Sequence, residues 1–379
     1  MIYVNTFIIN LSKKSKTAVF NQNWKRSVVK LLIIFFTLLL MALVFLTAPY
    51  LWLNLQLLGS ASGNFESVTF QESNDYFTNP FMGPVAPAHM RSREIEGTLV
   101  VGGFSWRDIE ETKGIFDFTG AEEDLHYRYW VNVEENQFII GMVLDYPKLS
   151  DEIGLDQIDI PLWVYEDLKK EAETNYLQLL NEAQEREDLA AIRELEKALH
   201  SIQNDKVLID EFNSNFDNIA DIPGVGTFYR WSMEMPGGGV EHRGGFSPNY
   251  SSPLLLEYHN QALKAVAERY DNENTFIVLM TSLGHWGESH TYYIKDPDAS
   301  GIYPPKELAS KYEEKYAEYF QNVIVSSRMP REVARENNFG LHNHGFGDPQ
   351  QTYNWFRDYY EHGYTCYHTG DNHPAMPDF

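Results

Sequence analysis

The sequence predicts an α/β protein built on a parallel sheet, and a (β/α)8 barrel is the architecture that fits its length. Short apolar segments that read as strands alternate with helical segments at the spacing of βα units. Polar and aromatic residues directly follow several of these strands, and parallel α/β barrels hold their functional groups at that end of the strands. A chain of 379 residues is long enough for one such barrel.

The segment 276–293, FIVLMTSLGHWGESHTYY, shows both features. Its apolar part, 276–280, follows a polar turn and is rich in β-branched and large side chains, which predicts a buried strand. Two glycines, two histidines, a tryptophan and Glu288 then stand within seven positions. We expect a central strand over 276–288 with Glu288 at its carboxyl end; the alternative is an ordinary strand-end loop with a surface glutamate.

The remaining elements complete the pattern of strand and helix. The other predicted strands are 98–104, 138–144, 227–233, 322–327 and 339–348, with a further strand near Thr369. The predicted helices are 252–270, 306–320, 331–337 and 352–362. Because an eight-stranded barrel needs one or two more strands, we expect a barrel that is incomplete at the C-terminus, as in a fragment.

Two stretches are expected to stand outside the barrel pattern. Leucines and other apolar residues recur at helical spacing among charged residues in 164–212, which predicts an inserted hairpin of two helices. The glycine-rich stretch 236–245 reads as a loop, and it lacks the spacing of a phosphate-binding loop.

The charge of the chain excludes one class of partner. The first 30 residues hold six basic residues and no Asp or Glu, whereas the whole chain carries −24, so the rest carries −30. A body this acidic is repelled by phosphates, which argues against nucleic acid. The single cysteine, Cys366, excludes an intrachain disulfide and a cysteine-based metal site.

An uncharged segment of 23 residues, 31–53, separates the basic N-terminus from the acidic body. Its length matches the ~20 residues that span a bilayer. The basic tail 1–30 predicts a cytoplasmic N-terminus, and the chain beyond the linker 54–78 is then a domain, 79–379, outside the cell membrane. Gly59-Ser60-Ala61 leaves a cleaved signal peptide as the alternative to a single-pass anchor.

Two groups of residues resemble a known family. Residues 105–110, SWRDIE, with 114–118, GIFDF, resemble the first βα segment of retaining glycoside hydrolases with (β/α)8 barrels. Asp145-Tyr146-Pro147, the helix end at 269–271 and the GxWGExH motif at 284–290 are similar to one bacterial, β-galactosidase-like branch, largely a domain of unknown function. The resemblance covers about residues 75–374, with the hairpin as an insertion.

The resemblance implies two catalytic carboxylates. Glu288 corresponds to the acid/base glutamate at the end of the fourth barrel strand. The nucleophile at the end of the seventh strand corresponds to Asp371, where the family has Glu, and the shorter side chain puts direct attack on the sugar in doubt. Gly287 also replaces the usual Asn before the acid/base residue, and 342–344 reads HNH where the branch has HDD.

Cleavage of a glycoside requires a protonated carboxyl and a carboxylate, without a metal or other cofactor. An apolar neighbour such as Trp286 is expected to raise the pKa of an acid/base glutamate. The residues expected to bind the carbohydrate are Trp106, Asp145, Tyr146, Trp231, His285, Trp286, His290, His342 and His344.

Two other functions remain open from the sequence. A degenerate barrel could bind carbohydrate at the cell surface without catalysis, because Asp371 replaces the expected glutamate. A metal-dependent hydrolase is the third, because His342, His344, His368 and His373 stand close together with Asp348 and Asp371.

Overall fold

The computed structural model describes residues 85–91, 97–235, 238–291, 304–329, 331–346 and 368–372, and only the backbone of 233–235, 343–346 and 368–372. The chain divides into two units, 1–76 and 77–379, and the described residues belong to the second. The predicted tail, membrane segment and linker all lie outside the described residues, as does the predicted helix 352–362. No helix among the described residues is long and apolar enough to cross a bilayer.

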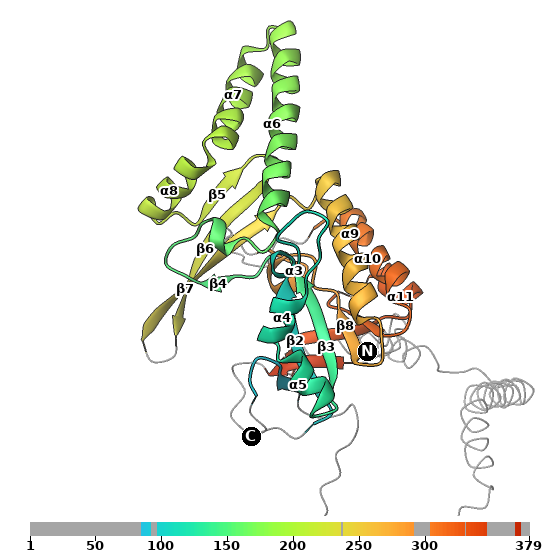
Figure 1. Ribbon diagram of the computed structural model, residues 1–379. Coiled ribbons are helices and arrows are strands. Elements are labelled where there is room, and N and C mark those ends of the chain that lie inside the picture. The colour runs from blue at the N-terminus through green and yellow to red at the C-terminus, as the bar shows by residue number, and fades with distance from the viewer. Residues whose placement is uncertain are drawn as a thin grey trace, which may run out of the picture. The chain divides into compact units, whose positions relative to one another are not determined.

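A parallel sheet is the centre of the second unit (Figure 1). Its strands lie in the order β1–β2–β3–β8–β9–β10–β11, and all of its pairings are parallel. They are Ala86–Pro87 (β1), Leu99–Ser105 (β2), Gln137–Val143 (β3), Thr275–Leu279 (β8), Ile324–Ser327 (β9), Gly340–Phe346 (β10) and His368–Asn372 (β11). The α/β class with a parallel sheet is thus confirmed, whereas the described strands form an open sheet and not a closed barrel.

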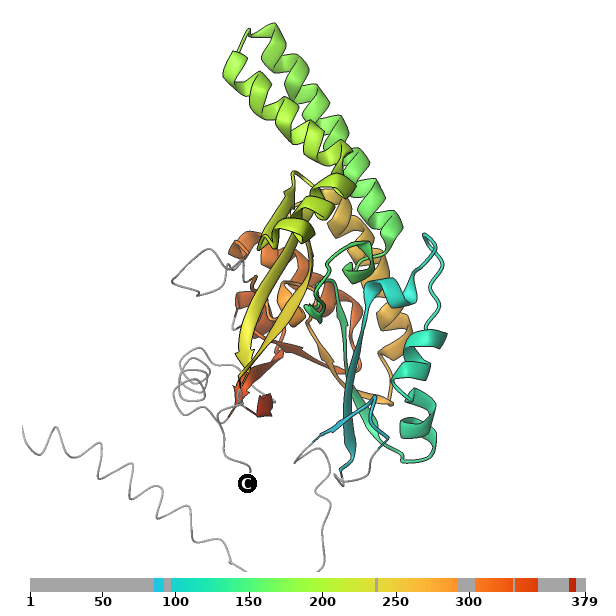
Figure 2. The same cartoon turned by 90° about the vertical axis from the view of Figure 1, so that its left-hand side faces the viewer.

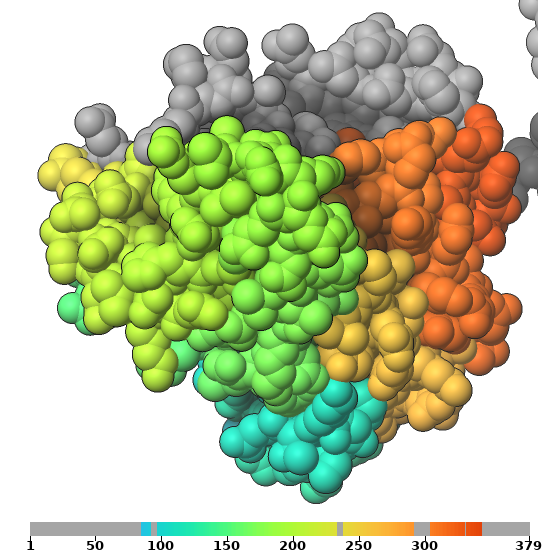
Figure 3. Space-filling view, turned by 90° about the horizontal axis from the view of Figure 1, so that it is seen from above, coloured from blue at the N-terminus to red at the C-terminus, as the bar shows by residue number. Residues whose placement is uncertain are grey.

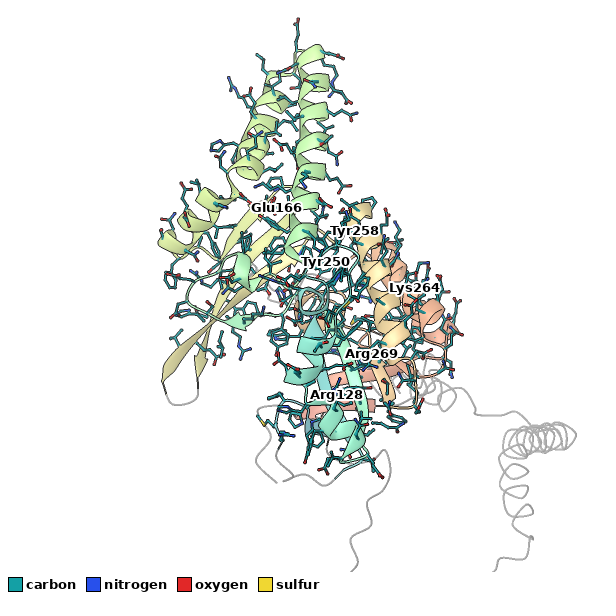
Figure 4. The ribbon with its side chains drawn as sticks, viewed as in Figure 1. Arg128, Glu166, Tyr250, Tyr258, Lys264 and Arg269 are labelled. Carbon is teal, nitrogen blue, oxygen red and sulfur yellow. The ribbon has the colours of Figure 1, made fainter. Side chains whose placement is uncertain are left out.

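The connecting helices cover one face of this sheet (Figures 1 and 2). They are Trp106–Ile109 (α3), Thr119–Asp124 (α4), Tyr127–Asn132 (α5), Pro253–Tyr270 (α9), Lys306–Tyr319 (α10) and Glu332–Glu336 (α11). Arg269, near the lower end of α9 in Figure 4, forms an ion pair of 2.5 Å with Glu122 of α4. The main hydrophobic core lies between these helices and the sheet.

Helix α9 illustrates how local sequence sets these elements. Ser252 caps its N-terminus by accepting the N–H of Leu255, and Pro253 occupies the first turn, where its missing N–H costs nothing. At the other end, the carboxylate of Asp271 accepts N–H groups from residues 321–323. This carboxylate therefore fixes the end of α9 to the turn that precedes β9.

The other face of the sheet changes in polarity along the strands. Its first part is aliphatic, with Leu99, Ile139 and Ile277 packed together. Farther along, the side chains alternate so that the same face carries glycine or polar residues. These residues are Gly103 and Ser105 on β2, Gly141 on β3, Ser326 on β9 and His342 on β10. The carboxyl ends of the strands are thus the polar end of this face.

A second, antiparallel sheet lies between β3 and β8 in the sequence, in the order β4–β7–β6–β5. Its strands are Lys148–Leu149 (β4), Ile219–Ile222 (β5), Gly226–Met235 (β6) and Gly239–Pro248 (β7). We call β6 and β7 the arm. Two predictions are wrong here, because 227–233 is not a barrel strand and most of 236–245 belongs to a strand.

Close packing explains why glycines occupy a strand of the arm. A Cβ at Gly244 would lie 2.5 Å from Ile153 and from the backbone oxygen of Tyr229. A Cβ at Gly245 would lie 2.7 Å from the hydroxyl of Tyr229. Glycine at these positions therefore serves close approach and not a turn.

The predicted helical hairpin is present and projects away from the sheets (Figures 1 and 2). It has three helices and not two: Leu162–Glu185 (α6), Leu189–Gln203 (α7) and Asp205–Asn215 (α8). The break falls at Asn204, whose backbone and side-chain amide groups both donate to the carbonyl of His200. Seen from above, the hairpin (green) and helices α9 to α11 (gold to orange) cover adjacent parts of one face (Figure 3).

Candidate active site

The segment after β8 forms a compact loop, 280–291, which we call the Glu288 loop. The strand ends at Leu279, so the prediction of a strand over 276–288 is wrong in its extent. The chain then folds back on itself: His285 N donates to His290 O at 2.8 Å, and Ser289 N donates to Leu283 O at 2.7 Å. A short 3-10 helix, His285–Gly287 (η2), lies inside the loop.

Four residues of this loop have left-handed backbone conformations. Gly284 and Gly287 have φ of 71° and 75°, and Trp286 and Ser289 have φ of 54° and 61°. A Cβ at Gly284 would lie 2.4 Å from the backbone of His290, and a Cβ at Gly287 would lie 2.3 Å from Cα of Thr281. Left-handed non-glycine residues are uncommon and persist only where their surroundings fix them. The loop is therefore held in one defined conformation.

Glu288 is one of the partly exposed side chains of this loop. Its side chain is 17% exposed, and one carboxylate oxygen lies 3.6 Å from Nδ1 of His290. Burial lowers the pKa of His290, although the negative charge of Glu288 acts in the opposite direction. A neutral imidazole and a carboxyl group thus lie side by side, at the end of β8.

Asp145 follows β3 and is completely buried beside the Glu288 loop. Its carboxylate accepts the hydroxyl groups of Tyr229 and Ser247, and Nδ1 of His285 lies 2.9 Å from Oδ2. Its backbone oxygen also accepts the N–H of Trp286 at 2.9 Å. The structure therefore brings Asp145, His285 and Trp286 together, and direct contact of this carboxylate with a sugar would compete with three bonds it already makes.

Aromatic side chains surround this group. The ring of Trp231, which is 6% exposed, stacks on Tyr229 at 5.6 Å and lies edge-on to Trp286 at 5.5 Å. Tyr146 is the most exposed, at 44%. Trp106, in contrast, is completely buried and donates its indole N–H to Glu110 at 2.7 Å, so its place is that of a core residue.

The later candidates lie on the last strands of the sheet. His342 on β10 is buried, and its Nδ1 lies 3.1 Å from Oγ of Ser326 on β9. His344 follows two residues later on β10. Asp371 lies on β11 between two pairings, Asn343 with Gly370 and Phe346 with Asn372, so its backbone is beside the end of β10. No group of three potential metal ligands occurs among the described residues.

Comparison with known proteins does not assign this chain to a family. No family model matches the sequence, and no curated protein matches it. Similar solved structures include endoglycoceramidase II from Rhodococcus sp. with a cellobiose-like isofagomine, at 10% identity and a TM-score of 0.33, covering 74% of this chain and 66% of that one. The lactosyl-enzyme intermediate of that enzyme gives 11% identity, a TM-score of 0.31, and coverage of 77% and 66%.

The chain thus spans slightly less than two thirds of the length of these structures. A TM-score near 0.3 does not establish a shared fold.

The sequence did not indicate several residues that hold this site. Tyr229 and Ser247 contact Asp145 from the arm, and Arg331 pairs with the buried Glu313 while its Nη1 lies 3.5 Å from Oγ of Ser289. Arg331 follows β9 closely, so the rule that polar residues after a strand mark a site would have found it. Tyr229 lies two positions from Trp231, a spacing that places both on one face of a strand.

Proposed function

We propose that this protein is a glycan-acting hydrolase that cleaves a glycosidic bond by carboxylate acid/base catalysis. Glu288 is the acid/base residue, and Asp371 supplies the second carboxylate. Trp286, Trp231 and Tyr146 contact the sugar. No metal or other cofactor takes part in this mechanism.

The position of Glu288 is the observation that carries the proposal. It lies after a strand of a parallel sheet, at the polar end, on a loop whose backbone is fixed by internal hydrogen bonds. Its side chain is partly exposed, whereas His285 and His290 on the same loop are buried. A general acid requires both accessibility and a fixed position.

The sheet order supports the assignment of the second carboxylate. β8, which precedes Glu288, is fourth in the sheet, and β11, which carries Asp371, is seventh. These are the positions that the resemblance implies for the two carboxylates. Aspartate is one methylene shorter than glutamate, so activation of a water molecule is the expected role of Asp371 and direct attack is not. Glycosidases in which a carboxylate activates water invert the configuration of the sugar. Their two carboxyl groups lie about 6.5–9.5 Å apart, which leaves room for the water molecule.

The first prediction tests Glu288. Glu288→Gln keeps the shape of the side chain but cannot donate a proton, so hydrolysis of glycosides with poor leaving groups should fall by about 10²–10⁴-fold. Aryl glycosides with activated leaving groups need less protonation and should lose less. Steady-state kinetics on both substrate classes measures the difference, and the exposed Glu257→Gln on α9 is the control.

Three outcomes would reject the assignment. Equal decreases in the rate of hydrolysis of both substrate classes would show that Glu288 is not the general acid. Activity that a chelator removes would favour the metal-dependent alternative. If no glycoside is turned over but a glycan binds and Trp286→Ala abolishes binding, the protein is a carbohydrate-binding module, which the cluster of Trp231, Tyr229 and Trp286 also suits.

We also propose that the domain lies outside the cell membrane and is anchored by residues 31–53. The support is the sequence alone: an uncharged segment of bilayer length behind a basic tail.

A further inference from the structure

Asp145 connects three parts of the molecule that are distant in sequence. It follows β3, it accepts hydrogen bonds from Tyr229 on β6 and Ser247 on β7, and it contacts the Glu288 loop at two points. One point is the side chain of His285, and the other is the N–H of Trp286. Oδ2 of Asp145 accepts a hydrogen bond from His285 in the tautomer that carries its proton on Nδ1. The arm therefore reaches the Glu288 loop through this buried carboxylate, in addition to the ring contacts of Tyr229 and Trp231 with His285 and Trp286.

The packing of the arm places the hydroxyl groups of Tyr229 and Ser247 at Asp145. Gly245 pairs with Tyr229 in the sheet, and a Cβ there would lie 2.7 Å from the Tyr229 hydroxyl. Burial and the adjacent negative charge of Asp145 raise the pKa of Tyr229 well above its ordinary value, so the phenol keeps the proton that it donates. A buried carboxylate requires such donors, because an unsatisfied charge in the interior is strongly unfavourable.

Contacts from outside the loop add to the internal hydrogen bonds that hold the Glu288 loop. Trp286 and Ser289 adopt left-handed conformations that their side chains disfavour. Such conformations persist only where the surrounding structure imposes them. The two contacts to Asp145 act on His285 and Trp286, directly before Gly287 and Glu288. A shift of Asp145 would therefore move the segment that carries the carboxyl group.

We propose that Tyr229 and Ser247 of the arm are positioning residues, which orient Glu288 by fixing Asp145 and, through it, the Glu288 loop. This deepens the proposed function, on which its catalytic part rests. The inserted sheet is then part of the catalytic machinery, although none of its residues needs to touch the reacting atoms.

Tyr229→Phe and Ser247→Ala test the proposal, because each removes one hydroxyl and leaves the rest of the side chain. Tyr165→Phe is the matched control for the first, since Tyr165 is also buried and donates to a carboxylate, Asp205, in the hairpin. Ser232→Ala is the control for the second, since Ser232 lies on β6 and its Oγ contacts His242 instead of Asp145.

Hydrogen exchange of the backbone amides in 283–290 is the first measurement, because it does not depend on catalysis. We expect faster exchange of this segment in Tyr229→Phe and Ser247→Ala and unchanged exchange in both controls. The second measurement is kinetic: kcat should fall by about 10-fold with KM within about 2-fold, as a displaced catalytic group predicts. Ser247→Thr keeps the hydroxyl and should restore most of kcat.

The outcomes separate this inference from the proposed function. Exchange that is unchanged, or that rises equally in the controls, overturns the restraint. Faster exchange with an unchanged kcat overturns the positioning role. Faster exchange in a protein that turns over no glycoside supports the restraint and rejects the proposed function instead.

Discussion

Asp145 and Asp159 are both buried, and they lie on either side of Tyr146, which follows Asp145 in the chain and donates its N–H to Asp159. Their surroundings differ. Asp145 has three side-chain partners, of which two are hydroxyl donors. Asp159 accepts the N–H of Tyr146 at 2.7 Å and pairs with Lys148 at 2.8 Å. Burial nevertheless raises the pKa of Asp159 to about 6, and the charge of Lys148 only partly offsets this effect. Ionisation of Asp159 therefore lowers the stability of the fold, by an amount that depends on pH.

The sign of that pH dependence follows from linkage. Between its ordinary pKa of 3.8 and the folded value of about 6, the folded chain binds more protons at Asp159 than the unfolded chain does. The stability contributed by this group is thus fully present below pH 4 and falls as the pH rises to about 6. At about 1.4 kcal/mol per pKa unit, the loss is about 3 kcal/mol.

Asp159→Asn tests this prediction, because asparagine does not titrate. The free energy of unfolding of the wild type, relative to that of the variant, should decrease by up to about 3 kcal/mol between pH 4 and pH 6.5. Urea denaturation of the 77–379 unit at several pH values measures it, with the exposed Asp156→Asn as control for the loss of a charge. A constant difference between wild type and Asp159→Asn would show that Asp159 is ionised throughout.

At the scale of elements, hydrophobic pattern and turn residues predicted the parallel sheet closely. β2, β3 and β9 lie within two residues of their predicted bounds, β8 begins one residue before its predicted start but ends nine residues before its predicted end, and Ser252 and Pro253 marked the start of α9. These features are local, since each depends on residues within one turn or one strand. The pattern placed Glu288 at the carboxyl end of the strand itself, whereas it lies on the loop nine residues after β8.

The arm was misread because its strands are decided by distant contacts. β6 has the composition of a barrel strand, and only its pairing with β5 and β7 makes it antiparallel. β7 contains three glycines, which locally predict a loop, but Ile153 and Tyr229 fill the space that side chains at two of them, Gly244 and Gly245, would occupy. The roles of Tyr229 and Ser247 were hidden for the same reason.

Two glycines of β7 test this explanation. Gly245→Ala would place a methyl group 2.7 Å from the Tyr229 hydroxyl, so we expect a loss of about 1–3 kcal/mol in the free energy of unfolding. Gly239→Ala, in the same strand, meets nothing within 4 Å and should change stability by less than about 1 kcal/mol. Thermal or urea denaturation of both variants compares them directly. Equal effects would mean that β7 uses glycine for its conformation and not for space.

At the scale of the whole chain, one long insertion between β3 and β8 determines what surrounds the site. It leaves the sheet at the carboxyl end of β3, where Asp145 lies, and returns through α9 to the strand that leads to Glu288. The insertion therefore enters beside the polar end of the sheet and contributes Tyr229, Trp231 and Ser247 there. The hairpin α6 to α8 extends from the same insertion on the outside (Figure 2).

The membrane segment 31–53 lies outside the described residues, so its prediction rests on the sequence. The full-length chain should be recovered in the membrane fraction and should resist extraction with carbonate, because residues 31–53 offer an uncharged span of bilayer length. Two arginines near its centre, Leu38→Arg with Leu40→Arg, should oppose insertion by about 5–7 kcal/mol and release the protein. Leu38→Ala with Leu40→Ala is the matched control and should stay in the membrane.

Orientation and cleavage need their own measurements. The six basic residues before the span predict a cytoplasmic N-terminus, so protease added outside intact cells should digest the domain and spare an N-terminal tag. An N-terminal tag that stays joined to the domain shows an uncleaved anchor, whereas its loss at the small residues 59–61 would show a signal peptide. A domain that resists protease until the cells are broken would contradict the predicted orientation, and a glycan outside the membrane could not then be its substrate.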